Sequence, residues 1–128
     1  MTIQNNKLIA IFMGGKTSDM NNRIVKGHQN IWLPIYGICD WSTINLSRGK
    51  ILQYHKSWDW LMQVVEKCES LDNTTVIIQE ESCIINHYQR KNRETFGKTK
   101  IEATYKAVVE FINWYNENKI NKNEKSSN

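Results

Sequence analysis

The strongest constraint on the fold is an amphipathic helix in the last third of the sequence. Thr99-Lys100-Ile101-Glu102 matches a capping box, in which a threonine at the N-cap is followed three residues later by a glutamate. Apolar residues then recur every three or four positions until about Asn116, at Ile101, Tyr105, Val108, Ile112 and Tyr115. A helix with one apolar face has to bury it, so we expect this helix to pack on a second layer of structure.

Two further helices are predicted, at about Lys7–Met13 and Trp58–Ser70. In the first helix, Asn5 or Asn6 can act as the N-cap, and Gly14-Gly15 marks the end. In the second helix Ser57 is the predicted N-cap. Its expected apolar face consists of Trp58, Leu61, Met62, Val65 and Cys68.

The segments between these helices favour strands. Lys16 to Asn30 is expected to be a loop, and Ile31 to Leu46 begins with a strand-like alternation that Pro34 confines to a sheet edge or a strand end. Two hairpins are also predicted, in which Thr43–Leu46 pairs with Lys50–Tyr54 through Ser47-Arg48-Gly49, and Thr74–Gln79 pairs with Ser82–Tyr88.

This order of elements predicts an α+β fold, a layered α/β sandwich with about three helices packed on a mostly antiparallel sheet. We expect residues 1–117 to form one domain, because 128 residues is the length of a single domain. Residues 118–128 are polar and have almost no apolar content, so we expect them to form a disordered tail.

Composition and charge exclude several classes of protein. The chain has 17 Lys and Arg against 13 Asp and Glu, a formal net charge of +4, which mildly favours anionic partners. No apolar run approaches the roughly 20 residues that cross a bilayer, and no secretory signal is recognisable. Cys39, Cys68 and Cys83 are odd in number and widely spaced, so we expect reduced core thiols. These features predict a cytoplasmic protein that does not associate with a membrane.

Three blocks of the sequence resemble a known group of proteins. They are Leu8-Ile9-Ala10 with Phe12-Met13-Gly14, then Tyr54 to Met62 followed by Val64 to Lys67, and then Ile101 to Asn116. The blocks resemble small uncharacterised proteins from bacteriophages and prophages of Bacteroidetes-type hosts, and the layout is similar to the phage ABA-sandwich domain. The chain departs from that pattern at Ile11, where an acidic residue is common, and at Gln63, where proline is common. The resemblance implies a phage origin and a sandwich fold, and it implies no particular chemistry.

The start of the last predicted helix is a candidate anion site. Gly97-Lys98-Thr99 looks like the end of a phosphate-binding loop, but Asn92 stands where that motif needs a glycine, so no nucleotide hydrolysis is expected. A helix N-terminus still offers free N–H groups and a partial positive charge. The alternative is a solvated basic loop beside an ordinary cap. The candidate ligands of the anion are Arg90, Lys91, Arg93, Lys98, Thr99 and Lys100.

Five tryptophans make the chain rich in large aromatic side chains. Trp58 and Trp114 are predicted to lie in the core, and Trp60 on the other side of its helix. Trp32 and Trp41, in the least regular region, are candidates to stack on a base of a bound ligand or to fill an interface. An aromatic-rich core or dimer contact is the alternative for all five.

The sequence contains no convincing catalytic or metal-binding motif. His55, Ser57 and Asp59 lie close together, but their positions suit the start of a helix, and no glycine-flanked nucleophile elbow surrounds the serine. His28 and His87 do not share metal-ligand spacing with His55. We therefore expect no enzyme activity, no cofactor and no metal.

Two hypotheses of function follow from these features. The first is a phage-encoded, non-enzymatic binding protein that sequesters a nucleotide-derived immune signal of the host, as a counter-defence protein. The second is a protein-interaction module, a homo-oligomer that inhibits or adapts a host protein. Sequence-independent nucleic-acid binding is a weaker third reading.

Overall fold

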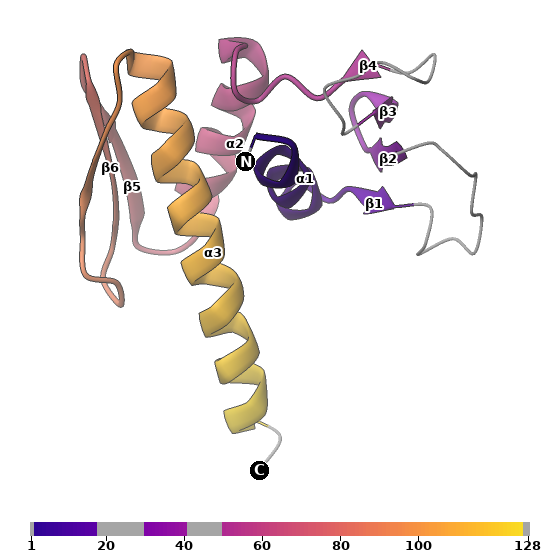
Figure 1. Cartoon of the computed structure of the whole chain (residues 1–128). Coiled ribbons are helices and arrows are strands. Elements are labelled where there is room, and N and C mark those ends of the chain that lie inside the picture. The colour runs from indigo at the N-terminus through magenta and orange to yellow at the C-terminus, as the bar shows by residue number, and fades with distance from the viewer. Residues whose placement is uncertain (1, 18–29, 41–49, 127–128) are drawn as a thin grey trace. The chain divides into compact units, whose positions relative to one another are not determined.

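The computed structural model of the chain describes residues 2–17, 30–40 and 50–126 (Figure 1). The fold class is α+β, as the sequence predicts. In the described residues the elements are α1 (Thr2–Phe12), β1 (Lys16–Thr17), β2 (Asn30–Leu33), β3 (Gly37–Asp40), β4 (Lys50–Ile51), α2 (Trp58–Ser70), β5 (Thr74–Ile78), β6 (Ser82–His87), β7 (Glu94–Phe96) and α3 (Lys100–Ser126).

The chain divides into two compact units, Met1–Val64 and Val65–Asn128, and the boundary falls within α2. The strands form two sheets, one in each unit. The sequence predicts a single sheet, whereas the described strands form two. We describe each unit by itself.

The sheet of the N-terminal unit has the strand order β1-β2-β3-β4. Strands β1, β2 and β3 are antiparallel, whereas β4 runs parallel to β3. Pro34 follows the last residue of β2, as its missing N–H requires. The turn Pro34–Tyr36 leads into Gly37, whose φ of 75° is a left-handed conformation that glycine adopts without strain.

Helix α1 begins five residues earlier than predicted. Asn6 is therefore not an N-cap: it lies inside the helix, is 2% exposed, and its Nδ2 donates to the carbonyl of Leu52 at 3.4 Å. The predicted glycine end is confirmed. Gly14 has a φ of 93°, and the N–H of Gly15 donates to the carbonyl of Ala10 at 2.8 Å, which closes a Schellman motif.

The first predicted hairpin lies partly outside the described residues, because residues 41–49 are not among them. The strand predicted at Lys50–Tyr54 is only Lys50–Ile51, and it pairs in parallel with β3. Tyr54 is instead a buried residue in a turn, with its ring edge-on to Trp60 at 5.2 Å between ring centroids.

Helix α2 has the predicted bounds, and the carbonyl of Ser57 accepts the first helical hydrogen bond from Leu61 at 3.0 Å. The predicted roles of two tryptophans are reversed. Trp60 is 7% exposed and stacks on Tyr36, with ring centroids 3.8 Å apart and an interplanar angle of 4°, whereas Trp58 is only half-buried. The predicted apolar face is therefore displaced, and Met62, predicted to lie within it, is 37% exposed.

The sheet of the C-terminal unit has the order β5-β6-β7 and is antiparallel throughout. The hairpin β5–β6 confirms the prediction, and the N–H of Gln79 donates to the carbonyl of Ser82 at 2.8 Å across its turn. Strand β7 was not predicted: it lies in a segment, residues 90–98, that sequence analysis treats only as a basic loop.

Helix α3 packs against β6 and β7 (Figure 1). Its buried face contains four residues that are fully buried, Ala103, Val108, Phe111 and Ile112. The helix does not end near Asn116 but continues to Ser126. It thus extends through most of residues 118–128, where the sequence predicts a disordered tail.

Candidate functional site

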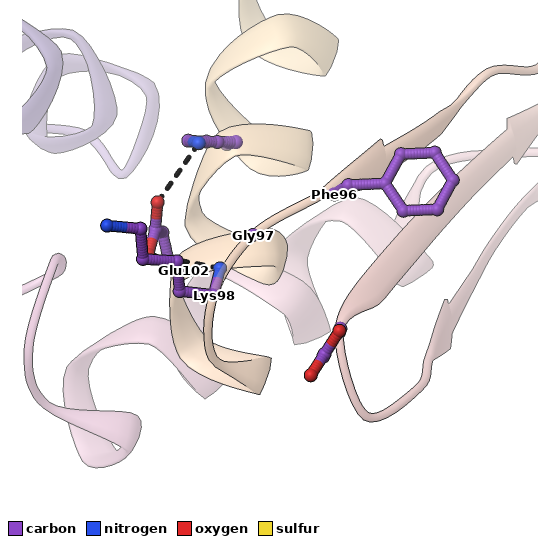
Figure 2. Close-up of a pocket in the computed structure, with 6 residues that line it drawn as sticks. Phe96, Gly97, Lys98 and Glu102 are labelled. Carbon is purple, nitrogen blue, oxygen red and sulfur yellow. Dashed lines mark hydrogen bonds and ion pairs between the residues drawn. The ribbon is translucent and has the colours of Figure 1, made fainter.

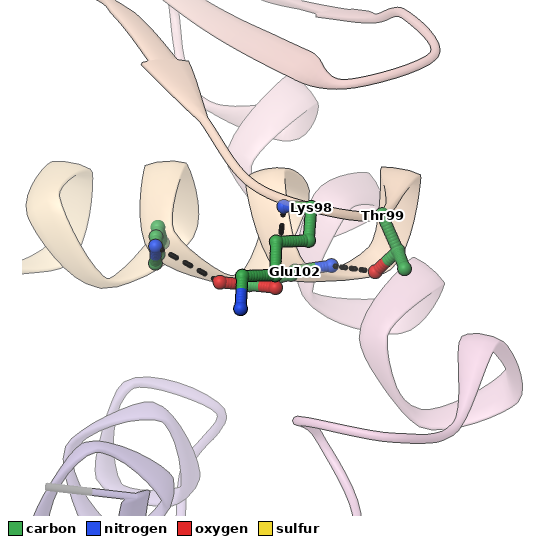
Figure 3. A network of polar contacts seen from close by, with 4 residues as sticks. Lys98, Thr99 and Glu102 are labelled. Atoms are coloured by element: carbon green, nitrogen blue, oxygen red, sulfur yellow. Dashed lines mark hydrogen bonds and ion pairs between the residues drawn. The ribbon is translucent and has the colours of Figure 1, made fainter.

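The start of α3 confirms the predicted capping box. The backbone N–H of Glu102 donates to Thr99 Oγ1 at 3.2 Å, and Glu102 Oε2 accepts from the backbone N–H of Lys98 at 3.3 Å (Figure 3). The glutamate side chain thus reaches one residue further back than the N-cap itself. The cap uses two N–H groups that an anion at this helix end would otherwise bind.

The carboxylate of Glu102 also forms an ion pair within α3. Its Oε1 lies 3.0 Å from Nζ of Lys106. The hydrogen bond from Lys106, and after it the one from the Lys98 backbone, lowers the pKa of Glu102. Glu102 therefore balances the charge of Lys106 and also interacts with the charge of the exposed Lys98, and Lys100 is exposed as well.

An open pocket of about 480 Å³ lies beside this cap (Figure 2). Its charged side chains are two carboxylates and two ammonium groups, so the pocket is not uniformly basic. In Figure 2 the ring of Phe96 points away from Lys98 and Glu102, and it is 64% exposed. The lining residues are Glu81, Phe96, Gly97, Lys98, Glu102 and Lys106.

The structure does not bring Arg90 to this helix end. Arg90 Nη1 donates to the carbonyl of Ile85 at 2.9 Å, and its guanidinium lies 5.7 Å from the ring centroid of Phe111. Partial burial lowers the pKa of Arg90, with a smaller opposing effect from Glu110. Phe111 is twelve residues beyond Thr99, or roughly 18 Å along a helix axis, so Arg90 has a structural role elsewhere on α3.

The other basic residues of that loop are exposed. The positive charge of Arg93 affects the pKa of Arg90, and Lys91 is the residue next to Arg90. Strand β7 separates this loop from Lys98 in the chain. Of the predicted anion ligands, Lys98, Thr99 and Lys100 lie together at the start of α3, and the structure does not place Arg90 with them.

The two predicted aromatic ligands belong to the N-terminal unit. Trp41 lies outside the described residues. Trp32 is on β2, directly opposite Ile38 of β3, and the two side chains are 43% and 61% exposed. Ile35 in the connecting turn is 72% exposed. We call these three residues, Trp32, Ile35 and Ile38, the outer hairpin surface.

Sequence reasoning missed Ile35 and Ile38 as surface residues. The alternation from Ile31 to Leu33 identifies which side of β2 is buried, but the register of β3 was needed to show that Ile38 lies opposite Trp32. The sequence left open whether Pro34 lies at a sheet edge or at a strand end; in the structure β2 ends at Leu33, and Ile35 lies in the following turn.

The structure shows packing and capping contacts for His55 and Ser57, two members of the group His55, Ser57 and Asp59. His55 Nδ1 accepts from Nδ2 of Asn6 at 2.9 Å, an arrangement that suits a neutral imidazole. Burial and, to a lesser degree, the charge of Lys56 lower the pKa of His55. Ser57 is the N-cap of α2.

Within the ranges that the structure describes, no group of side chains is placed to bind a metal ion, and the cysteines are buried. No three His, Cys, Asp or Glu side chains there lie close enough to hold a metal ion. His28 is outside these ranges. Cys39, Cys68 and Cys83 are buried and form no disulfide. Burial raises the pKa of Cys68 to about 12 and that of Cys83 to about 11, so both are neutral thiols at physiological pH.

Comparison with known proteins adds no assignment. No protein-family model, no curated protein and no solved structure matches this chain. Within the described ranges, none of the helices is both long enough and apolar enough to cross a membrane.

Proposed function

We propose that this chain is a non-enzymatic binding protein that contacts another protein through the outer hairpin surface. The supporting observation is the apolar character of the exposed positions. Ile31, Leu33 and Cys39 already supply the buried side of the β2–β3 hairpin. Outward positions of a half-buried antiparallel sheet are ordinarily polar, yet Trp32 and Ile38 occupy them here.

The attachment of the hairpin supports a preformed contact surface. Tyr36, in the turn between β2 and β3, stacks on Trp60 of α2, and its hydroxyl accepts a hydrogen bond from Gln63 Nε2. A surface that is already ordered loses less conformational entropy when a partner binds. Exposed tryptophan is also enriched among the residues that dominate binding energy at protein interfaces.

The resemblance to phage proteins suggests the setting. In this proposal the chain acts in the cytoplasm of an infected cell, and its partner is a host protein that it inhibits or adapts. Such a role needs binding alone and no catalytic group.

The test is tagged purification from infected host cells followed by protein mass spectrometry. We expect a host protein in stoichiometric amount with the wild type and its loss in the double variant Trp32→Ser, Ile38→Ser. Tyr88→Ser is the matched control, because Tyr88 is 68% exposed but belongs to the other unit. Identical protein sets for the double variant and the wild type would contradict the proposal.

A second candidate function is sequestration of a nucleotide-derived immune signal at the start of α3. The observation in its favour is the pocket of about 480 Å³ beside a helix N-terminus, where Lys98 and Lys100 are exposed. Helix N-termini favour anions, and 300 to 1,000 Å³ is about the usual size of a small-ligand pocket.

Calorimetric titration of nucleotides and cyclic nucleotides tests this second candidate. If a nucleotide binds there, Lys98→Ala with Lys100→Ala should weaken binding at least about tenfold, because each lost charge contact contributes on the order of 1 kcal/mol. Arg93→Ala should leave affinity unchanged and is the matched control. Binding that the double variant does not weaken, or that Arg93→Ala weakens equally, would place the ligand elsewhere.

A further inference from the structure

The outer edge of β5 carries backbone groups that no strand in the described part of the C-terminal unit pairs. Gln79 and Ser82 form a hydrogen-bonded pair of the β5–β6 ladder, and such pairs alternate along an antiparallel ladder. Thr75 and Ile77 therefore direct their N–H and C=O groups to β6. Thr74, Val76 and Ile78 direct theirs to the outer edge. The backbone groups of the five β5 residues thus alternate between the side paired with β6 and the unpaired outer edge.

Strand β5 also lacks the features that normally protect an edge. All five of its residues are uncharged and β-branched. The opposite edge strand, β7, has only three residues, and one of them is Glu94. Natural edge strands are usually short or charged, which prevents pairing with another chain. Of the two edges of this sheet, β5 is the one suited to accept a further strand.

We propose that β5 pairs antiparallel with β5 of a second copy of this chain, about a two-fold axis at Ile77. Val76 then lies opposite Ile78 of the second copy and exchanges two N–H···O=C hydrogen bonds with it, and the same pair recurs on the other side of the axis. Ile77, which is 44% exposed, contacts Ile77 of the second copy on the outer face of the sheet. The two three-stranded sheets become one sheet of six strands.

The exposed Ile77 selects this register. An axis at Val76 would place Ile77 opposite Thr75 of the second copy, and an axis at Thr75 would place it opposite Asn73, which lies in the turn before β5. Only an axis at Ile77 gives this exposed apolar side chain an apolar partner directly opposite. A second copy is therefore the occupant that matches β5 in both hydrogen-bond spacing and apolar contact.

Cysteine cross-linking tests the pairing in the full chain. Ile77→Cys brings two thiols together at the axis, where Cα atoms are about 4.5 Å apart, within the range for a disulfide. We expect a disulfide-linked dimer after mild oxidation. Thr75→Cys is the matched control on the same face, because its two copies are four residues out of register, roughly 13 Å apart. The three native cysteines are buried.

The same experiment can overturn the proposal. No cross-linked dimer with Ile77→Cys, equal cross-linking with Thr75→Cys, or cross-linking only in a mixture of the two variants would each contradict an axis at Ile77. The last result would indicate the register centred on Val76.

Measurements without new cysteines give an independent check. In the wild type, the amides of Val76 and Ile78 should gain protection from hydrogen exchange as concentration rises, whereas the amide of Ile77 is protected throughout. Ile77→Lys places two charges at the axis and should raise the dimer Kd at least about tenfold. Ile38→Lys, at a more exposed position in the other unit, should leave the dimer unchanged, which separates this proposal from the one on the outer hairpin surface. A wild type that sediments as a monomer at all concentrations would overturn the pairing.

Discussion

Asn6 combines deep burial with hydrogen bonds that link α1 to the segment before α2. Its Nδ2 donates both to the Leu52 carbonyl and to His55 Nδ1. Asn6→Leu is close in volume but leaves both acceptors without this donor. We expect the free energy of unfolding to fall by about 1–3 kcal/mol, measured by urea denaturation. Gln4→Leu, at an exposed position of the same helix, should change it far less, and an equal loss in both variants would contradict the assigned role.

His55 gives the stability a dependence on pH. Because the pKa of His55 is lowered in the folded protein, the unfolded chain binds a proton more readily. This contribution to stability is therefore fully present above the unfolded pKa of about 6.5 and is lost as the pH falls below that value and through the lower folded pKa. Protonation of Nδ1 also removes the acceptor of the Asn6 hydrogen bond.

The check is thermal unfolding of the wild type and of His55→Asn between pH 8 and pH 5. We expect the wild type to lose more stability on acidification than the variant, whose amide oxygen can accept from Asn6 without titrating. Parallel curves for the two proteins would contradict the assignment of this pH dependence to His55.

Individual tryptophans show where sequence reasoning stops at this scale. Trp58 and Trp60 are two positions apart and point to nearly opposite sides of α2, so only one of them can lie within its apolar face. The stacking of Trp60 on Tyr36 decides which is buried, and that contact joins residues far apart in the sequence. The same holds for Trp32 at the candidate site: its exposure depends on the register with β3.

At the scale of elements, the capping box explains why the start of α3 could be predicted. Thr99→Ala removes the acceptor for the Glu102 N–H and should reduce stability by about 1 kcal/mol in chemical denaturation. Thr99→Ser keeps the hydroxyl and should retain most of the stability. If both variants unfold at the same denaturant concentration, the hydroxyl has no capping role.

Gly97 and Gly37 allow two requirements for glycine to be compared, a lack of space for a Cβ and a left-handed backbone conformation. A Cβ at Gly97 would lie 2.6 Å from the backbone nitrogen of Ala103, whereas one at Gly37 meets nothing within 4 Å. Gly97→Ala must therefore displace the first turn of α3, and we expect a loss of about 2–3 kcal/mol. Gly37→Ala has only its left-handed φ to accommodate, at about 1 kcal/mol. The ranking in urea denaturation checks this, and a larger loss at Gly37 would contradict it.

Local signals predict elements well when a cap or a repeating pattern defines them. The glycine end of α1, the bounds of α2 and the hairpin β5–β6 were all predicted from nearby residues. Strand β7 was missed because three residues cannot establish an alternation, and its existence depends on the ladder with β6. The start of α1 was missed because Asn6 resembles a cap in sequence but is satisfied by a distant segment.

At the scale of the whole molecule, the C-terminal part of α3 extends beyond its buried face. Among the α3 side chains whose burial is described, up to Asn118, the last fully buried one is Ile112, and Glu117 and Asn118 are exposed. Truncation after Asn118 should therefore leave the melting temperature within about 2 °C of the wild type, because Ile120 is the only apolar residue in the removed sequence. Circular dichroism should register the shorter helix. A large fall in melting temperature would show that the removed residues stabilise the fold.

The class of fold was predictable, and the site only in part. Lys98, Thr99 and Lys100 are adjacent in sequence, so one capping box was enough to locate them together. The position of Arg90 depends on β7, which carries the chain away from the loop before α3 begins. The division of the strands between two sheets was also beyond the sequence, because it depends on which strands pair with which.

The reactivity of the buried thiols can report local opening of the folded chain. Cys39 belongs to the N-terminal unit, and Cys68 and Cys83 belong to the C-terminal unit. A buried thiol reacts with an alkylating reagent only while its surroundings are open. The modification rate at each cysteine, followed by peptide mass spectrometry, thus reports how often each unit opens under native conditions, with no label added and no residue replaced.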